Sequence, residues 1–448
     1  MTKPLEQMTD NKIMQAKRQI ARACKIDCCH ISYFNEEKQS NIVDERMLPH
    51  TDFIVNHKGK NKLEISLDNL VRIQHSVRFE NCEFVENISG AYDFYRLFVF
   101  YRCIFKKKFR IINANEISLV ALDCDFLDEF LVMATTIKQI CIKSIFMAKI
   151  DFYTCEFLDI AIFEGSEFLE SVSLSDATFN KSVSFSDTIF KYPPNLSQTI
   201  FKDEVNFVGT EMDFNYKILD KTIDGCAKKE ECKKFFLTHK HRDSFRLIKN
   251  SLAKNGNTLD ASQYHKMELY CKEIELESKE QKSPSDWLEK WQLWFYRKTS
   301  DHHTDLLMIV SWVMACIGLF GLVSFGYRHG GQLIDSSEID RYPVMHFLEG
   351  LWGAEVYRAS SESGFVLLAI GVSAVGLLSN FSRMILGVLL SLCVVISNPK
   401  NIFGVAKLFE GQKISGAENV IIFFYAFVMI LLLFSLQKTA RKNTITPS

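Results

Sequence analysis

The chain has 448 residues, 47% of them apolar, and its 53 basic and 54 acidic side chains give a formal net charge of −1. This length excludes a single domain. The near-neutral total conceals an asymmetry, because residues 79–216 carry 21 acidic and 12 basic side chains, a balance of −9, which leaves +8 on the remainder. The chain has thirteen cysteines, and several of them occupy small inward positions of the repeat described below. There they behave as compact hydrophobes in a reducing compartment, so no disulfide framework is expected.

Residues 1–75 are predicted to form an N-terminal cap or irregular region. One helix is predicted around residues 13–23, followed by a mixed segment that covers the start of the next domain. Residues 1–27 are polar and lack the apolar core of a signal peptide. We therefore expect the soluble part of the chain to stay in the cytoplasm.

A repeat with an unbroken spacing of eleven residues dominates the next domain. Its central positions are Phe146, Phe157, Phe168, Phe179, Phe190, Phe201 and Met212. A second series at the same period runs through Phe152, Phe163, Leu174, Phe185, Leu196 and Phe207. Gaps of five and six residues alternate between the two series, so the chain turns a corner at each gap and returns to the same azimuth after about 22 residues. The sequence therefore predicts a β-solenoid.

Each short face of this solenoid directs one large and one small residue inward, because side chains two apart in an extended segment share a face. Stacked coils then form a column of Phe rings. The predicted repeat core is Phe146, Phe152, Phe157, Phe163, Phe168, Phe179, Phe185, Phe190, Phe201 and Phe207.

The pattern extends backward more loosely. Cys82, Cys103 and Cys124 recur at one constant spacing, which predicts a solenoid over residues 76–216 with about six coils. Lysines at positions 106–108 and 138 interrupt the rhythm. Loops or irregular coils are therefore expected over residues 106–120 and 127–143.

These residues resemble the pentapeptide-repeat family, in the variant where each pair of five-residue faces carries one extra residue. Segments 172–179 and 183–190 are similar to its repeat unit. The resemblance implies a right-handed, four-sided β-helix. It says little about function, since the family includes DNA mimics that protect gyrase, scaffolds and sensor parts of larger proteins.

Residues 217–304 are predicted to form a helical connector. Apolar residues at helical spacing lie on both sides of an Asn-Gly-Asn break at positions 255–257, which indicates an antiparallel helix pair. This segment is similar to the connector that joins pentapeptide repeats to membrane domains in bacterial relatives. Two Cys and His groups, at residues 24–30 and 226–241, lack the paired ligand spacing of a zinc site.

A turn and cap at residues 283–286 start a further helix that carries Trp287, Trp291 and Trp294. This aromatic run, followed by Arg297 and Lys298, suits a helix lying at the cytoplasmic headgroups. A packed amphipathic helix of the connector is the alternative.

Residues 305–448 are predicted to form a transmembrane helical domain of three to four spans. Residues 306–327 and 419–437 carry no charge and are long enough to cross the bilayer. Residues 363–399 carry one charge, Arg383. Basic residues are balanced between the two possible topologies, so the side of the C-terminus stays open.

Small and polar residues recur every three or four positions in the middle segment. The predicted stripe for pore lining or helix packing is Ser373, Gly376, Asn380, Arg383, Gly387 and Ser391. In an oligomer Arg383 would form a positive constriction that favours anions. In the alternative, residues 380–383 form the turn of a hairpin and Arg383 reaches the headgroups.

No phosphate-binding Gly loop, nucleophile elbow or H-E-x-x-H motif is present, so we expect no enzyme, no catalytic residue, no cofactor and no metal. The leading hypothesis is a non-enzymatic protein of the bacterial inner membrane. Its cytoplasmic solenoid would recognise an unidentified protein and control an oligomeric, channel-like or membrane-permeabilising module, as in stress or phage-defence effectors.

Two alternatives remain. In the first, the protein is a membrane-tethered scaffold whose helices only anchor it and form homo-oligomers. In the second, the acidic solenoid acts as a DNA mimic on basic proteins. The short rod and its membrane anchor disfavour the DNA mimic, and nucleic acid is not an expected partner. The expected partners are a lipid bilayer, a cytoplasmic protein and further copies of the chain.

Overall fold

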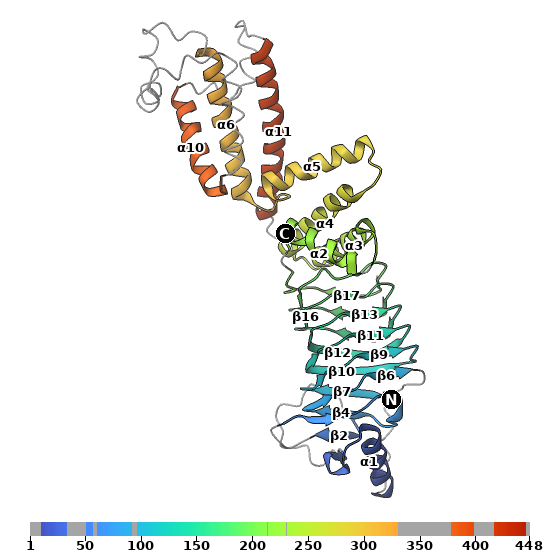
Figure 1. Cartoon of the computed structure of the whole chain (residues 1–448). Coiled ribbons are helices and arrows are strands. Elements are labelled where there is room, and N and C mark those ends of the chain that lie inside the picture. The colour runs from blue at the N-terminus through green and yellow to red at the C-terminus, as the bar shows by residue number, and fades with distance from the viewer. Residues whose placement is uncertain are drawn as a thin grey trace. The chain divides into compact units, whose positions relative to one another are not determined.

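The computed structural model describes residues 10–33, 51–56, 61–91, 96–212, 214–229, 231–329, 378–397 and 416–444, and Figure 1 labels its elements. They belong to two compact units, residues 1–281 and 282–448. The helices are α1 Asp10–Cys24, α2 Tyr216–Lys229, α3 Lys234–Lys254, α4 Thr258–Ser278, α5 Pro284–Ser300, α6 Leu306–His329, α10 Asn380–Ser397 and α11 Gly416–Thr444.

The strands all lie in the first unit within the described residues. They are β1 Ile31–Tyr33, β2 Phe53–Asn56, β3 Leu63–Ile65, β4 Val77–Glu80, β5 Cys82–Phe84, β6 Ile88–Ala91, β7 Leu97–Tyr101, β8 Ile104–Phe105, β9 Phe109–Ile112, β10 Ile117–Phe126, β11 Phe130–Met133, β12 Thr136–Phe146, β13 Ile150–Tyr153, β14 Glu156–Phe157, β15 Ala161–Ile162, β16 Glu167–Phe168, β17 Val172–Ser173, β18 Thr178–Phe179, β19 Val183–Ser184, β20 Ile189–Phe190, β21 Ile200–Phe201 and β22 Val205–Asn206.

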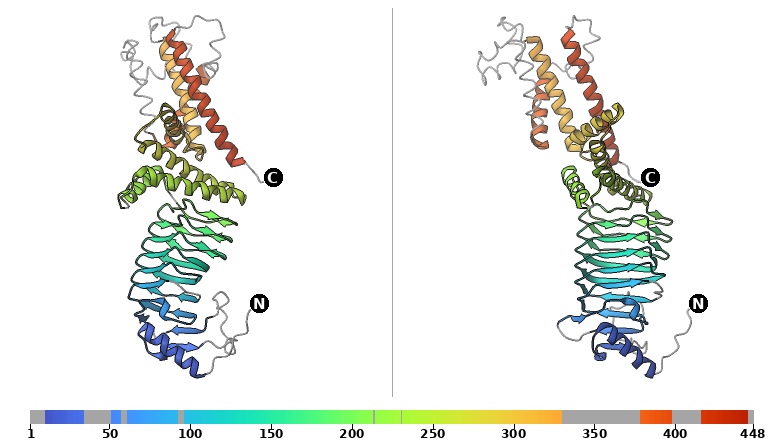
Figure 2. Two further views of the ribbon diagram at one scale, coloured as in Figure 1. Left: turned by 90° about the vertical axis from the view of Figure 1, so that its right-hand side faces the viewer. Right: turned by 45° about the vertical axis from the view of Figure 1, so that its right-hand side comes forward.

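Stacked parallel strands over residues 53–206 form a β-solenoid of about seven coils. Phe109 pairs with Phe130 on the next coil, and Phe157 pairs in the same way with Phe179. The separation of these partners along the sequence agrees with the return distance of about 22 residues that the eleven-residue repeat predicts. Figure 2 shows the stacked coils from two further directions. The predicted β-solenoid is confirmed.

The solenoid begins earlier than the predicted residue 76. Strand β2 pairs in parallel with β4, with Phe53 beside Val77 and Val55 beside Phe79, and Phe53 and Val55 are fully buried. The separation between Phe53 and Val77 along the sequence is longer than in the regular coils. The sequence therefore shows no fixed period that would mark this first coil.

For residues 106–120 and 127–143, the prediction of loops is wrong at most positions, whereas the alternative of irregular coils agrees with the structure. Strands β9 to β12 pass through them, and β12 alone has 11 residues. The interrupting lysines lie on the outside, where Lys108 pairs with Glu129 at 3.3 Å. Phe130 pairs with Ile150, a shorter separation along the sequence than in the regular coils. The eleven-residue register is therefore lost here while the strands persist.

Stacked aromatic rings fill the solenoid as predicted, but they form several columns rather than one. Positions eleven residues apart alternate between faces, so each column collects every second position. The columns include Phe157–Phe179–Phe201, Phe146–Phe168–Phe190 and Phe163–Phe185–Phe207. Neighbouring rings within them have centroids 4.1 to 5.3 Å apart. All the predicted core Phe residues are buried except Phe201, which is partly buried.

Helices cover both ends of the solenoid (Figure 2). At the N-terminal end, the predicted first helix is confirmed as α1, whose Ile20 and Cys24 are fully buried in the solenoid core. At the other end lie α2, α3 and α4. The predicted helix pair is confirmed as α3 and α4, which meet at residues 255–257. Both caps protect strand edges that would otherwise expose unpaired backbone groups.

In the second unit, α6 runs antiparallel to α11 and parallel to α10. Ile309 and Leu432 share one apolar cluster, while Phe320 stacks on Tyr425 with ring centroids 3.9 Å apart. Helix α10 runs in the same direction as α6, because Gly387 lies against Ala315 and the later residue Leu390 lies against the later residue Gly318. In the described part of residues 282–448, α6 therefore lies between α10 and α11, with α5 beside α6 and α11 (Figure 1).

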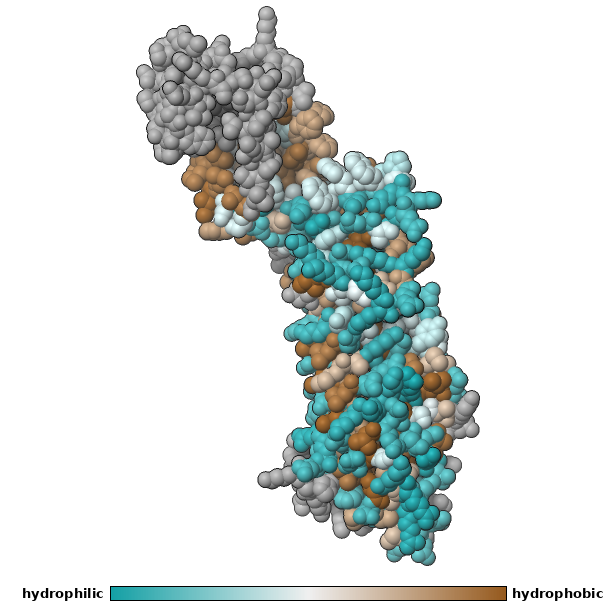
Figure 3. Space-filling model, in the orientation of Figure 1, coloured by the Kyte–Doolittle hydropathy of each residue, from teal (hydrophilic) through white to brown (hydrophobic). Residues whose placement is uncertain are grey.

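The second unit is the apolar part of the chain, and brown side chains gather there in Figure 3. Within the described residues, one helix is long and apolar enough to cross a membrane, Ile421–Arg441, with a mean hydropathy of 2.1. Leu306–Gly321 and Asn380–Leu392 are shorter apolar helical stretches. The predicted spans 306–327 and 419–437 coincide with α6 and α11.

Candidate functional site

The predicted polar stripe falls on α10 and on the segment before it. Asn380, Arg383, Gly387 and Ser391 lie on α10, whereas positions 373 and 376 lie outside the described residues. Helix α10 begins at Asn380, and the two residues before it are not helical. The stripe is therefore interrupted at this point and does not follow one continuous helix.

Gly387 and Ser391 face α6 of the same chain. A Cβ at Gly387 would stand 2.7 Å from the backbone nitrogen of Ala315, and one at Gly318 would stand 2.6 Å from the Leu390 Cβ. The Ser391 hydroxyl donates to the Met314 carbonyl at 3.1 Å. Small residues let two helices approach until their backbones touch. In this arrangement these two positions of the stripe are engaged in helix packing.

Arg383 also lies against α6, near the end where that helix begins. Its Nη2 donates to the Leu378 carbonyl at 2.9 Å, and its guanidinium lies 4.2 Å from the centroid of the Trp312 ring. The indole Nε1 of Trp312 donates to the Lys298 carbonyl at 3.0 Å. Only 5% of Arg383 is exposed. The guanidinium is therefore held by a cation–π contact with Trp312 and by a hydrogen bond to the Leu378 carbonyl, just before α10 begins.

A buried polar elbow joins α5, α6 and α11. Asp301, His302 and His303 occupy the left-handed region, with φ of 48°, 56° and 67°. The His303 Nδ1 lies 2.8 Å from the Ser435 hydroxyl, which donates to the Ser300 hydroxyl at 2.9 Å. Three successive non-Gly residues in this region store strain. The hydrogen bonds to α11 hold the elbow in this conformation.

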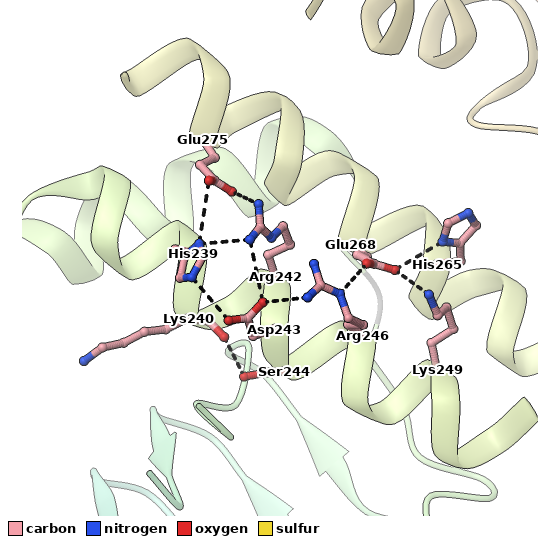
Figure 4. A network of polar contacts seen from close by, with 10 residues as sticks. All are labelled: His239, Lys240, Arg242, Asp243, Ser244, Arg246, Lys249, His265, Glu268 and Glu275. Carbon is pink, nitrogen blue, oxygen red and sulfur yellow. Dashed lines mark hydrogen bonds and ion pairs between the residues drawn. The ribbon is translucent and has the colours of Figure 1, made fainter. Parts of the chain in front are cut away.

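In the first unit, α3 and α4 are joined by a charged network (Figure 4). Arg242 pairs with Glu275, and Arg246 pairs with Glu268 at 3.0 Å. Glu268 also accepts from Lys249 at 2.8 Å. Burial raises the pKa of Glu268, but hydrogen bonds from His265, Lys249 and Arg246 outweigh it and lower the pKa to about 2. Glu268 is thus the ionised centre that three basic side chains share.

Side chains of α3 satisfy backbone groups of the last coil. The Ser244 hydroxyl accepts from the Leu196 N–H at 2.8 Å, and the Ser251 hydroxyl donates to the Val205 carbonyl at 2.6 Å. His241 is buried beside them. The sequence predicted this helix but gave no sign of these contacts, because a Ser or His on a helix face has many other uses.

The C-terminal coils carry an acidic surface. Residues 151–213 hold 12 Asp or Glu and 3 Lys, and their carboxylates occupy outward positions of the repeat. Asp151 pairs with Lys149 and Glu170 with Lys229. Throughout the described coils, Glu164, Glu167, Asp176 and Asp187 form no ion pair. These carboxylates are therefore available to a basic partner.

The described residues offer little for catalysis. Among them no group of three or more His, Cys, Asp and Glu side chains is placed to hold a metal ion. The inward cysteines are buried, and burial raises the pKa of Cys155 to about 12. An open hollow of about 350 Å³ lies between the last coil and α3, lined by residues such as Asp203, Leu247 and Lys254. Of the hydroxyls in its lining, that of Ser251 already donates to the Val205 carbonyl.

Comparison with protein families identifies the coils. Residues 143–189 and 163–211 match the family described as pentapeptide repeats (9 copies). The later coils, within residues 143–211, are pentapeptide repeats. Pentapeptide-repeat solenoids are structural or interaction folds and generally not enzymes. No curated protein and no solved structure matches the chain.

Proposed function

We propose that this chain is a membrane-anchored interaction protein, whose pentapeptide-repeat domain binds a basic protein partner in the cytoplasm. The proposal is supported by a rigid solenoid closed at both ends, by its unneutralised acidic coils and by an apolar second unit. A solenoid presents an extended surface whose outward positions keep fixed spacing. Outward carboxylates on that surface favour partners of opposite charge and increase their association rate.

The second unit would supply the anchor. If α6 and α11 both cross the bilayer, their antiparallel directions place the end of α11 on the same side as the start of α6. Lys438 and Arg441 would then lie on the same side as Arg297 and Lys298. The basic residues do not decide between three and four spans.

The observation that carries the proposal is the acidic surface of the last coils. The test uses the full-length protein in its native membrane, with a photoreactive amino acid placed at outward position Ile189, which pairs with Glu167 on the same face. We expect one reproducible protein adduct. The triple variant Glu164→Gln, Glu167→Gln, Asp187→Asn should lose at least about tenfold of it. The matched variant Asp123→Asn, Asp125→Asn, Asp128→Asn on earlier coils should retain it. An equal yield from both triple variants would contradict the acidic surface as the binding site.

A channel is the second candidate, and the Arg383 cation favours it because an ionisable residue in an apolar segment is costly unless it has a use. In this alternative an oligomer turns part of the α10 face toward an aqueous path. The test is liposome leakage of the wild type, Arg383→Ala and Arg383→Glu. Ion-selective leakage that reverses its selectivity in Arg383→Glu would support a pore. No leakage from any of the three would leave the anchor alone. A place in stress or phage defence stays a prediction from the domain architecture and the Arg383 stripe.

A further inference from the structure

Helix α5 carries a ridge of exposed aromatic side chains. Trp287, Trp291 and Trp294 follow one another at spacings of four and three, which places them on one face of a helix. They are 66%, 37% and 44% exposed. Lys298, four residues further on, continues the same face and is exposed. Three exposed Trp side chains on one stripe are unusual for a surface in water.

The opposite face of α5 is already occupied. Leu293, Thr299 and Ser300 are buried, with 8% or less exposed. Ser300 takes part in the hydrogen bonds to α11. The helix is therefore held through the side that carries Leu293 and Ser300, and the Trp ridge lies on the other side.

The position of α5 along the length of α6 and α11 indicates what surrounds its Trp ridge. Phe295 packs with Ile309, Val313 and Leu432, which belong to the first turns of α6 and to the second half of α11. Trp312, two turns into α6, donates to the Lys298 carbonyl. Helix α5 thus lies beside the apolar helices, level with the first turns of α6, rather than beyond them.

We propose that α5 is an interfacial helix, and that its Trp ridge lies in the boundary between headgroups and acyl chains of a bilayer with anionic lipids. This inference rests on the proposed crossing of α6 and α11. At that depth, indole rings place their apolar body among the acyl chains and keep the N–H near water. Lys298, at the end of the ridge, pairs with lipid phosphate.

The observations favour lipid over a protein partner or a second copy. The ridge has bulky rings and no small residues, whereas helix interfaces inside membranes use small residues for close approach. Its only exposed charge on the stripe is a cation, which fits a phosphate. The residues at the level of α5 on α6 and α11 are themselves apolar and exposed on their outer sides, as Leu306, Leu307 and Phe434 show.

The test places a benzophenone amino acid singly at three positions of the full-length protein, reconstituted in vesicles of phosphatidylglycerol and phosphatidylcholine. Position Trp291 tests the ridge, Phe427 on the exposed side of α11 is the membrane control, and Ile160 on the solenoid is the aqueous control. We expect lipid adducts at 291 and 427 and at least about tenfold less at 160. The phosphatidylglycerol share of the adduct at 291 should fall in Lys298→Gln.

The outcomes are distinct. Lipid adducts at 427 without any at 291 would overturn the interfacial helix and leave the membrane anchor standing. No adduct at either position would overturn both. A cross-link from 291 to a second copy or to another protein would assign the ridge to that partner and reject the bilayer. An unchanged phosphatidylglycerol share in Lys298→Gln would reject the phosphate contact.

Discussion

Gly387 of α10 and Ala315 of α6 lie in direct backbone contact, since a Cβ on the glycine would stand 2.7 Å from the alanine nitrogen. Replacement Gly387→Leu should therefore push the two helices apart. The expected cost is about 2 to 3 kcal/mol from overpacking. Thermal unfolding of the purified protein in detergent, followed by the fluorescence of the tryptophans in the second unit, measures it.

The matched control for this helix pair is Leu389→Phe. Leu389 lies close to Gly387 on the same helix, is 55% exposed, and its enlargement meets no neighbour in the described bundle. The control should unfold at the wild-type temperature. Equal unfolding temperatures for wild type and Gly387→Leu would mean that α6 and α10 do not approach in this way.

Phe179 is the middle ring of one aromatic column, with its centroid 4.1 Å from that of Phe157 and 5.1 Å from that of Phe201. Phe179→Ala should destabilise the solenoid by about 3 to 5 kcal/mol, because it removes buried area and leaves a cavity between two coils. Hydrogen exchange of peptides from residues 150–210, read by mass spectrometry in urea, reports this unit separately. Ile200→Ala, at a position 55% exposed, should change it by less than about 1 kcal/mol. Equal effects would contradict the inward assignment.

The solenoid could be predicted from the sequence because every coil needs the same inward residues at the same spacing. Wherever successive coils have the same length, each inward Phe has a counterpart at a fixed distance along the sequence, as with Phe157 and Phe179. The same physics gave no signal where coil length varies. Phe53 belongs to the first coil although its partner Val77 lies beyond the regular separation. The short coil from Phe130 to Ile150 could be predicted only as a loop or an irregular coil.

The candidate site was less readable. Residue spacing placed Gly387 and Ser391 on one stripe, and they do share a face of α10. The spacing could not decide whether that face contacts water, another copy of the chain or α6, because small residues are compatible with each of these environments. The Trp ridge of α5 had the same ambiguity between packing and lipid, and only the depth of Phe295 beside Ile309 and Leu432 separates them.

A corner of the last coil requires glycine. Gly209 has φ of +72°, and a Cβ there would stand 2.2 Å from the Asp187 Oδ1. Gly209→Ala should cost about 2 kcal/mol, from left-handed strain and from displacement of that carboxylate. In an Asp187→Ala background the cost should fall to about 1 kcal/mol, the strain alone. Gly256, with φ of +79° and nothing within 4 Å of its Cβ, is the strain-only control. Urea unfolding, followed by the same hydrogen-exchange peptides, compares the variants, and no rescue by Asp187→Ala would reject the close approach.

His241 links the pH dependence of stability to the contact between α3 and the last coils. It is 5% exposed, and its Nδ1–H donates to the Pro194 carbonyl at 3.4 Å. Burial lowers the pKa of His241 from 6.5 to about 4. The hydrogen bond to Pro194 raises this pKa, and the charge of Lys240 lowers it further. The unfolded chain binds a proton near pH 6.5, and the folded chain only near pH 4. Between these values the unfolded state holds more protons, so the free energy of unfolding falls as the pH falls, and above pH 6.5 this group has no effect.

The variant His241→Gln isolates this effect, because an amide N–H can replace the imidazole donor but does not titrate. Lowering the pH from about 7 to about 4 should cost the wild type about 3 kcal/mol more than the variant. The loss should be progressive below about pH 6.5. Acidic groups common to both proteins, including Glu268, cancel in the difference. Urea midpoints from hydrogen exchange of residues 190–210 and α3 give both profiles. Parallel profiles would mean that the imidazole is accessible to water in the folded protein, and that α3 does not seal the end of the solenoid.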